Sequence, residues 1–284
     1  MIKLEEYKLK ATVEKLKFGI VQGRLTQSPK GVIQCFPKDW EKEFSKAAKL
    51  GLDNIELIAD REYNEENPLW SFKGVEKLKR LSSKYSVGIK TICNDNIINY
   101  SLLNNNIINK NIELIRIAKK LECDKYILPL FEKSELNISN YKEFINSINL
   151  IAKCCEESNI TLCLETILKG EDLLFVLSKL ESENIKIVFD TGNRVAFGHN
   201  IYDDIRILKE KIEHIHIKDK NIDNENVILG TGLVNFLEVF KALKKINYEK
   251  SFTFETRRGS NPLYTCKFNI DMINFLYLEA YNGI

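Results

Sequence analysis

EHIHIKD, at residues 213–219, alternates polar and apolar side chains from His214 to Lys218. Successive side chains of a β-strand point to opposite faces, so the two histidines and the lysine share one face and the two isoleucines share the other. ITLCLET at 160–166 and SFTFETR at 251–257 alternate in the same way. The strands of a barrel turn their apolar face toward the surrounding helices, so the polar face of each segment should point to the barrel interior. The strongest polar groups come last in each segment, at the carboxyl end, where such barrels hold their active sites.

Eight short apolar or β-branched runs recur along the chain, about 33 residues apart, which is the length of one strand–helix unit. We expect strands at residues 18–22, 54–58, 87–92, 125–130, 160–165, 185–190, 213–218 and 251–256. The segments between them have helical periodicity: Trp40, Phe44 and Ala47 fall on one face of a helix that Gly51 should end. Strands that alternate with helices over eight units predict an α/β fold, a (β/α)8 TIM barrel formed by residues 18–284 as a single domain. Residues 1–17 are expected to form an N-terminal extension before the first strand.

The composition argues against several classes of protein. Of the 284 residues, 29% are charged and the net charge is +2, without the basic stripe of a nucleic-acid-binding surface. No apolar run approaches the roughly 18 residues of a membrane span, and the charged N-terminus is unlike a signal peptide. Seven cysteines, an odd number without a C-x-x-C pair, argue for reduced thiols rather than disulfides or a thiolate zinc site. We therefore expect a cytoplasmic protein with no nucleic-acid or membrane partner.

Four potential metal ligands fall at the carboxyl ends of consecutive predicted strands: Glu165, Asp190, His216 and Glu255. Each alone has an ordinary structural explanation: the aspartate as a turn cap, the histidine as a hydrogen-bonded core residue, and the glutamates as partners of Lys218 or Arg257. Together, three carboxylates at one height of a barrel would repel one another, and a divalent cation removes that repulsion. A set of oxygens with one imidazole favours Mn²⁺, Mg²⁺ or Co²⁺, with Zn²⁺ as an alternative.

Other polar residues at the predicted mouth of the barrel are candidates for binding substrate. Gln22, Arg24 and Glu56 lie in or just after the first two strands and could bind hydroxyls or a phosphate. An ion pair between Arg24 and Glu56 is the structural alternative. Lys218 and Arg257 share the inward parity of their strands, which makes them candidates for binding an anionic group of the substrate.

Several short motifs, by their order and spacing, resemble the sugar phosphate isomerase/epimerase superfamily, whose members have a xylose-isomerase-like TIM barrel, and in particular its ketose 3-epimerases. The motifs are GIVQGRL at 19–25, LGLDNIELI at 50–58, YILPL at 126–130, LETIL at 164–168, FDTGN at 189–193, HIHIKD at 214–219, LGTG at 229–232 and FET at 254–256. The resemblance implies that Asp190 and His216 bind the metal together with Glu165 and Glu255. It also implies that the two glutamates act as acid and base on opposite faces of the substrate. Asn193 stands where other members have a histidine, and we take it as a substrate contact.

The resemblance further implies an isomerase, namely a divalent-metal-dependent epimerase or isomerase of a sugar or sugar phosphate. One glutamate would remove a proton next to a carbonyl, through a metal-stabilised enediolate. Return of the proton to the opposite face gives an epimer, and return to the neighbouring carbon gives an aldose–ketose isomer. A polyol (inosose-type) dehydratase on the same metal site and a non-catalytic sugar-binding barrel are the alternatives.

A DNA-repair endonuclease with several zinc ions is a more distant possibility on a similar barrel. It would need a basic groove and more ligands than three histidines supply. We therefore expect a small carbohydrate as the partner of the site, and leave association into a homo-oligomer open.

Overall fold

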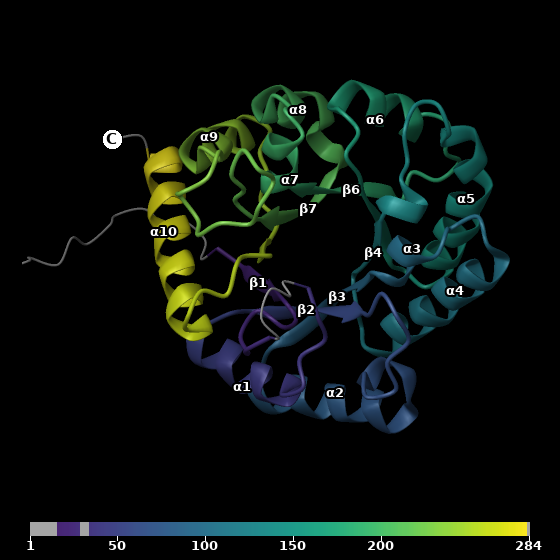
Figure 1. Cartoon of the computed structure of the whole chain (residues 1–284), viewed down its shortest axis with the longest axis horizontal. Coiled ribbons are helices and arrows are strands. Elements are labelled where there is room, and N and C mark those ends of the chain that lie inside the picture. The colour runs from purple at the N-terminus through teal and green to yellow at the C-terminus, as the bar shows by residue number, and fades with distance from the viewer. Residues whose placement is uncertain (1–15, 29–33, 283–284) are drawn as a thin grey trace, which may run out of the picture.

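Eight parallel strands close into a barrel in the computed structural model, which describes residues 16–28 and 34–282 (Figure 1). Each strand pairs with the next one along the chain, and the last pairs with the first. The strands are β1 Phe18–Val21, β2 Asn54–Ala59, β3 Gly88–Asn94, β4 Lys125–Pro129, β5 Thr161–Glu165, β6 Ile185–Asp190, β7 Ile212–Ile217 and β8 Phe252–Phe254. The predicted single-domain (β/α)8 barrel is confirmed. The predicted N-terminal extension lies almost entirely outside the described residues.

Helices form a ring around the barrel, and α10 packs against both α9 and α1 to complete the ring (Figure 1). The helices are α1 Trp40–Leu50, α2 Phe72–Tyr85, α3 Asn96–Asn99, α4 Asn105–Lys120, α5 Tyr141–Glu157, α6 Gly170–Leu177, α7 Thr191–Ala196, α8 Ile201–Leu208, α9 Phe236–Lys245 and α10 Pro262–Asn282. Short 3-10 turns add η1 Pro68–Trp70, η2 Glu132–Ser134 and η3 Lys209–Lys211. As predicted, α1 ends at Gly51, whose φ of 73° is readily adopted only by glycine. Within the described residues, none of the helices combines the length and apolar character that crossing a membrane requires.

Two separate apolar layers follow from the alternation of side chains along the strands. Leu162 and Leu164 belong to the large core between the strands and the helices. Cys163, which lies between them in sequence, instead packs in a small interior cluster with Cys93, Ile127 and Val188. The polar residues that share the parity of Cys163 are therefore directed to the inside of the barrel. This arrangement brings the ends of the strands to a common polar centre.

A buried carboxylate holds the loop that follows β1. Glu43 of α1 accepts hydrogen bonds from the backbone N–H groups of Gly23 (2.7 Å) and Leu25 (3.0 Å). The hydroxyl of Thr26 donates to the same carboxylate at 2.9 Å. Burial raises the pKa of Glu43. The three donors satisfy its carboxylate oxygens, which would be costly to bury without hydrogen bonds. The loop is thereby fixed, with Arg24 at the mouth of the barrel.

Candidate metal centre and active site

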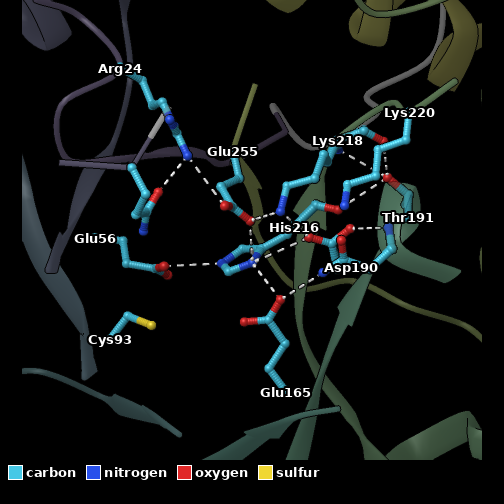
Figure 2. Close-up of polar contacts among 12 residues, drawn as sticks. Arg24, Glu56, Cys93, Glu165, Asp190, Thr191, His216, Lys218, Lys220 and Glu255 are labelled. Carbon is cyan, nitrogen blue, oxygen red and sulfur yellow. Dashed lines mark hydrogen bonds and ion pairs between the residues drawn. The ribbon is translucent and has the colours of Figure 1, made fainter. Parts of the chain in front are cut away.

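Four side chains meet at the carboxyl ends of β5 to β8. Glu165 and Asp190 are the last residues of β5 and β6, His216 is the second-last residue of β7, and Glu255 follows β8 directly. Each offers one ligand atom within 4.8 Å of those of the other three. Asp190 and His216 are register partners on neighbouring strands, which fixes their height in the barrel. The structure thus brings together the four residues that strand parity placed at one level (Figure 2).

The two ring nitrogens of His216 have different environments. Nε2 lies 3.0 Å from Glu56 Oε1. Nδ1 is buried without a hydrogen-bond partner, although it lies within ion-pair distance of Glu255 Oε2 (3.2 Å), Glu165 Oε1 (3.8 Å) and Asp190 Oδ2 (4.0 Å). Burial lowers the pKa of His216, but the surrounding carboxylates outweigh burial and raise the pKa above its usual value. A divalent cation could take the place of the proton on Nδ1, while the proton on Nε2 is donated to Glu56. The donor set of Nδ1 and these three oxygens fits such a cation.

Glu56 is fully buried and contacts two histidines. Besides His216, its carboxylate contacts His214 Nε2 at 2.8 Å. Burial alone raises the pKa of Glu56, but the two histidines outweigh burial and lower the pKa to about 2. The carboxylate is therefore ionised and orients His216. The alternative ion pair with Arg24 is not formed, because Arg24 Nη2 lies 3.2 Å from Glu255 instead.

Lys218 places a buried ammonium between two of the carboxylates. Its Nζ lies 2.8 Å from Asp190 Oδ2 and 2.6 Å from Glu255 Oε2 (Figure 2). Burial lowers the pKa of Lys218, but the two carboxylates outweigh burial and raise the pKa above its usual value. The ammonium is thus held charged, and it contacts two of the three oxygens that face His216 Nδ1.

The pKa values of the two glutamates are shifted in opposite directions. Burial raises the pKa of Glu165. Burial acts in the same direction on Glu255, but Lys218, His216 and Arg24 outweigh it and hold the pKa of Glu255 well below its usual value. An active site in which one carboxyl group acts as acid and another as base needs pKa values that differ in this way.

Asp190 serves both as a helix cap and as a member of the cluster. Its Oδ1 accepts a hydrogen bond from the backbone N–H of Asn193 at 2.7 Å and so caps α7. Its Oδ2 faces His216 and Lys218. The side-chain amide of Asn193 donates to Glu165 Oε1 at 3.4 Å. The turn-cap explanation therefore accounts for only one of the two carboxylate oxygens.

Two of the predicted substrate-binding residues lie away from the centre. Arg257 is exposed, because β8 ends at Phe254 and its alternation does not extend that far; the buried arginine is Arg258. Gln22 is buried, but its side-chain oxygen accepts a hydrogen bond from the backbone N–H of Ile58 at 3.2 Å and so links β1 to β2.

A cavity of about 140 Å³ opens onto the cluster, with Glu165, His216 and Lys218 among the residues that line it. Its lining also includes Asp95, which the sequence analysis missed. Burial raises the pKa of Asp95 to about 7. Asp95 directly follows β3. The expectation that polar residues at the carboxyl ends of the strands form the site would therefore have predicted it.

Comparison with known proteins agrees with the barrel fold. A putative L-ribulose-5-phosphate 3-epimerase from Haemophilus influenzae is 23% identical over 278 residues, which cover 88% of this chain and 93% of the relative. An inosose dehydratase from Clostridium botulinum is 22% identical over 162 residues, 48% of this chain and 54% of that relative. The crystal structure of a D-psicose 3-epimerase with D-tagatose from Clostridium cellulolyticum superposes with a TM-score of 0.73 at 17% identity, covering 92% of this chain and 99% of the other. Residues 44–274 match the model of a family described as xylose isomerase-like TIM barrel.

Proposed function

The chain belongs to the xylose isomerase-like TIM barrel family, and on this premise we propose that it is a divalent-metal-dependent epimerase or isomerase of a sugar or sugar phosphate. The observation that carries the proposal is the unpartnered, buried Nδ1 of His216, which faces one oxygen each of Glu165, Asp190 and Glu255. Three carboxylates and one imidazole suit Mn²⁺, Mg²⁺ or Co²⁺, with Zn²⁺ as the alternative. Such an ion would supply a Lewis acid that polarises the carbonyl of the substrate.

We assign proton transfer to the two glutamates. Figure 2 shows their carboxylates approaching His216 from opposite sides. A substrate carbon held between them can lose a proton to one glutamate and receive a proton from the other, which inverts that carbon. Lys218 and Arg24 hold Glu255 in place through ion pairs, and Asn193 steadies Glu165 through its amide. Return of the proton to the neighbouring carbon instead gives an aldose–ketose isomer.

A polyol dehydratase is the second candidate function, and the similarity to an inosose dehydratase favours it. The first step, removal of a proton next to a carbonyl, is the same. The reactions diverge when the carbanion expels a neighbouring hydroxyl instead of being reprotonated. Product analysis separates them, because only dehydration gives a product that has lost one molecule of water.

The test combines metal analysis with proton exchange. Protein purified without chelators or a metal column should contain about one Mn, Mg, Co or Zn per chain, or take it up on addition. In deuterated water, the metal-loaded protein should place deuterium on the carbon next to the carbonyl of a ketose or ketose phosphate, which NMR detects. A protein that stays metal-free after addition of Mn²⁺ or Co²⁺ would contradict the proposal.

Glu56→Gln is expected to weaken metal binding about 10–100-fold, because the ligand histidine loses the carboxylate that fixes its tautomer. Competition with a chromogenic chelator measures this affinity without reference to turnover. Glu41→Gln is the matched control, since Glu41 is an exposed residue of α1 that pairs with Lys77. Equal affinities for wild type and Glu56→Gln would show that Glu56 does not orient the ligand.

A further inference from the structure

A second, larger cavity of about 270 Å³ adjoins the cavity at the candidate metal centre. The two share Gln34, Arg61 and Asp95 in their linings. The inner cavity ends on His216, whose Nδ1 lacks a hydrogen-bond partner. A substrate whose carbonyl end lies at the metal centre therefore extends its other end into this outer cavity.

The outer cavity is acidic. Asp60, Glu62 and Asp95 line it, and among its described lining residues the one cation is Arg61. Arg61 is itself engaged, because its Nη1 lies 2.9 Å from Glu132. Glu62 keeps its pKa below the usual value through its hydrogen bond with Tyr100 and is therefore ionised. Carboxylates accept several hydrogen bonds each, so they suit hydroxyl donors.

Two cations at the candidate centre, Lys218 and Arg24, are held by its carboxylates. Lys218 lies between Asp190 and Glu255, and Arg24 lies against Glu255. A phosphate brought to this mouth would have to draw these groups away from their present partners.

The loop after β7, one of the places where TIM barrels frequently bind phosphate, already has its backbone N–H groups engaged. After β7, Asp219 accepts hydrogen bonds from Gly230 (2.9 Å), Gly232 (2.9 Å) and Val234 (3.1 Å). An internal carboxylate therefore takes the N–H groups of the LGTG turn that a phosphate would use. A side chain at position 232 would meet this carboxylate, so glycine is required for the close approach.

We infer that the substrate of this site is an uncharged polyhydroxylated ketone, and that its terminal hydroxyls donate to the carboxylates of the outer cavity. The inference rests on the proposed function and narrows it, because a sugar phosphate would bring a dianion against the ionised Glu62, beside Asp60 and Asp95, whose pKa values burial raises. Like charges placed together in this way oppose binding strongly.

The test uses the full-length, metal-loaded protein and matched pairs of substrates, such as D-ribulose with D-ribulose 5-phosphate and D-fructose with D-fructose 6-phosphate. Deuterium exchange next to the carbonyl gives kcat/KM for each. In the pair with the highest activity, we expect kcat/KM for the free ketose to exceed kcat/KM for its phosphate by at least about 100-fold. A preference for the phosphate would overturn this inference and leave the proposed function standing. Exchange with no member of any pair would overturn both.

A charge reversal probes the outer cavity directly. Glu62→Lys should lower the ratio of kcat/KM for the free ketose to kcat/KM for its phosphate by about tenfold or more, because a cation replaces a carboxylate in the lining. Glu65→Lys is the matched control, since Glu65 is exposed in the same loop and lies outside both linings. An equal ratio in the wild type and Glu62→Lys would overturn the assignment of the outer cavity to the far end of the substrate.

Discussion

Replacing both Glu165 and Glu255 with glutamine is expected to abolish metal binding and to lower the rate of proton exchange by about 10⁴-fold or more. Two of the three carboxylates that face His216 Nδ1 would become neutral amide groups. The same two residues are the proposed acid and base, so loss of metal and loss of proton transfer should coincide. Elemental analysis and deuterium incorporation measure the two effects on one preparation.

The control for this double variant is a pair of equally conservative substitutions outside the cluster. Glu183 and Glu238 are exposed, and each pairs with one exposed or half-buried lysine. Glu183→Gln with Glu238→Gln should therefore retain metal and activity. A Glu165, Glu255 double variant that kept a full metal ion would place the ion elsewhere in the chain. One that lost metal but still bound a ketose as tightly as wild type would support a binding barrel over an enzyme.

Alternation along the strands was sufficient to predict the barrel and the level of the candidate centre. It works because the parity of a strand decides which side chains face inward, and parity is visible over four or five residues. Glu165 and His216 are inward for this reason. It failed at Arg257, because β8 is only three residues long and the chain leaves the sheet before that position.

The partners of the inward residues were less predictable, because they depend on contacts across the barrel. Glu56 and His216 are 160 positions apart in the sequence, and only the closure of the sheet brings them within 3.0 Å. A ligand-orienting role for Glu56 therefore had no local signal. Lys218 has inward parity in the sequence, but nothing there indicates that its ammonium lies between Asp190 and Glu255, two of the candidate ligands.

Lys218→Met is expected to lower the free energy of unfolding of the metal-free protein by about 3–5 kcal/mol, because it leaves a buried cluster of carboxylates without the ammonium that balances them. Urea denaturation in the presence of a chelator measures the effect. Lys220→Met is the matched control: Lys220 is only partly buried, and its Nζ bonds the side chain of Asn224. It should change the unfolding free energy by less than about 1 kcal/mol.

Adding metal should reduce the effect of Lys218→Met, and this reduction separates charge from packing. The ammonium and His216 Nδ1 contact the same oxygens, Asp190 Oδ2 and Glu255 Oε2. A bound cation and the ammonium therefore compete for these carboxylates, and removing the ammonium should tighten Mn²⁺ binding by about tenfold or more. A bound ligand stabilises the fold by an amount that grows with the logarithm of its affinity, and a tenfold gain in affinity is worth about 1.4 kcal/mol. Saturating Mn²⁺ should therefore reduce the loss of stability caused by Lys218→Met by about 1.4 kcal/mol or more. A loss of the same size with and without Mn²⁺ would instead show that Lys218 contributes through the packing of its side chain, and that the carboxylates do not share their charge with a metal ion.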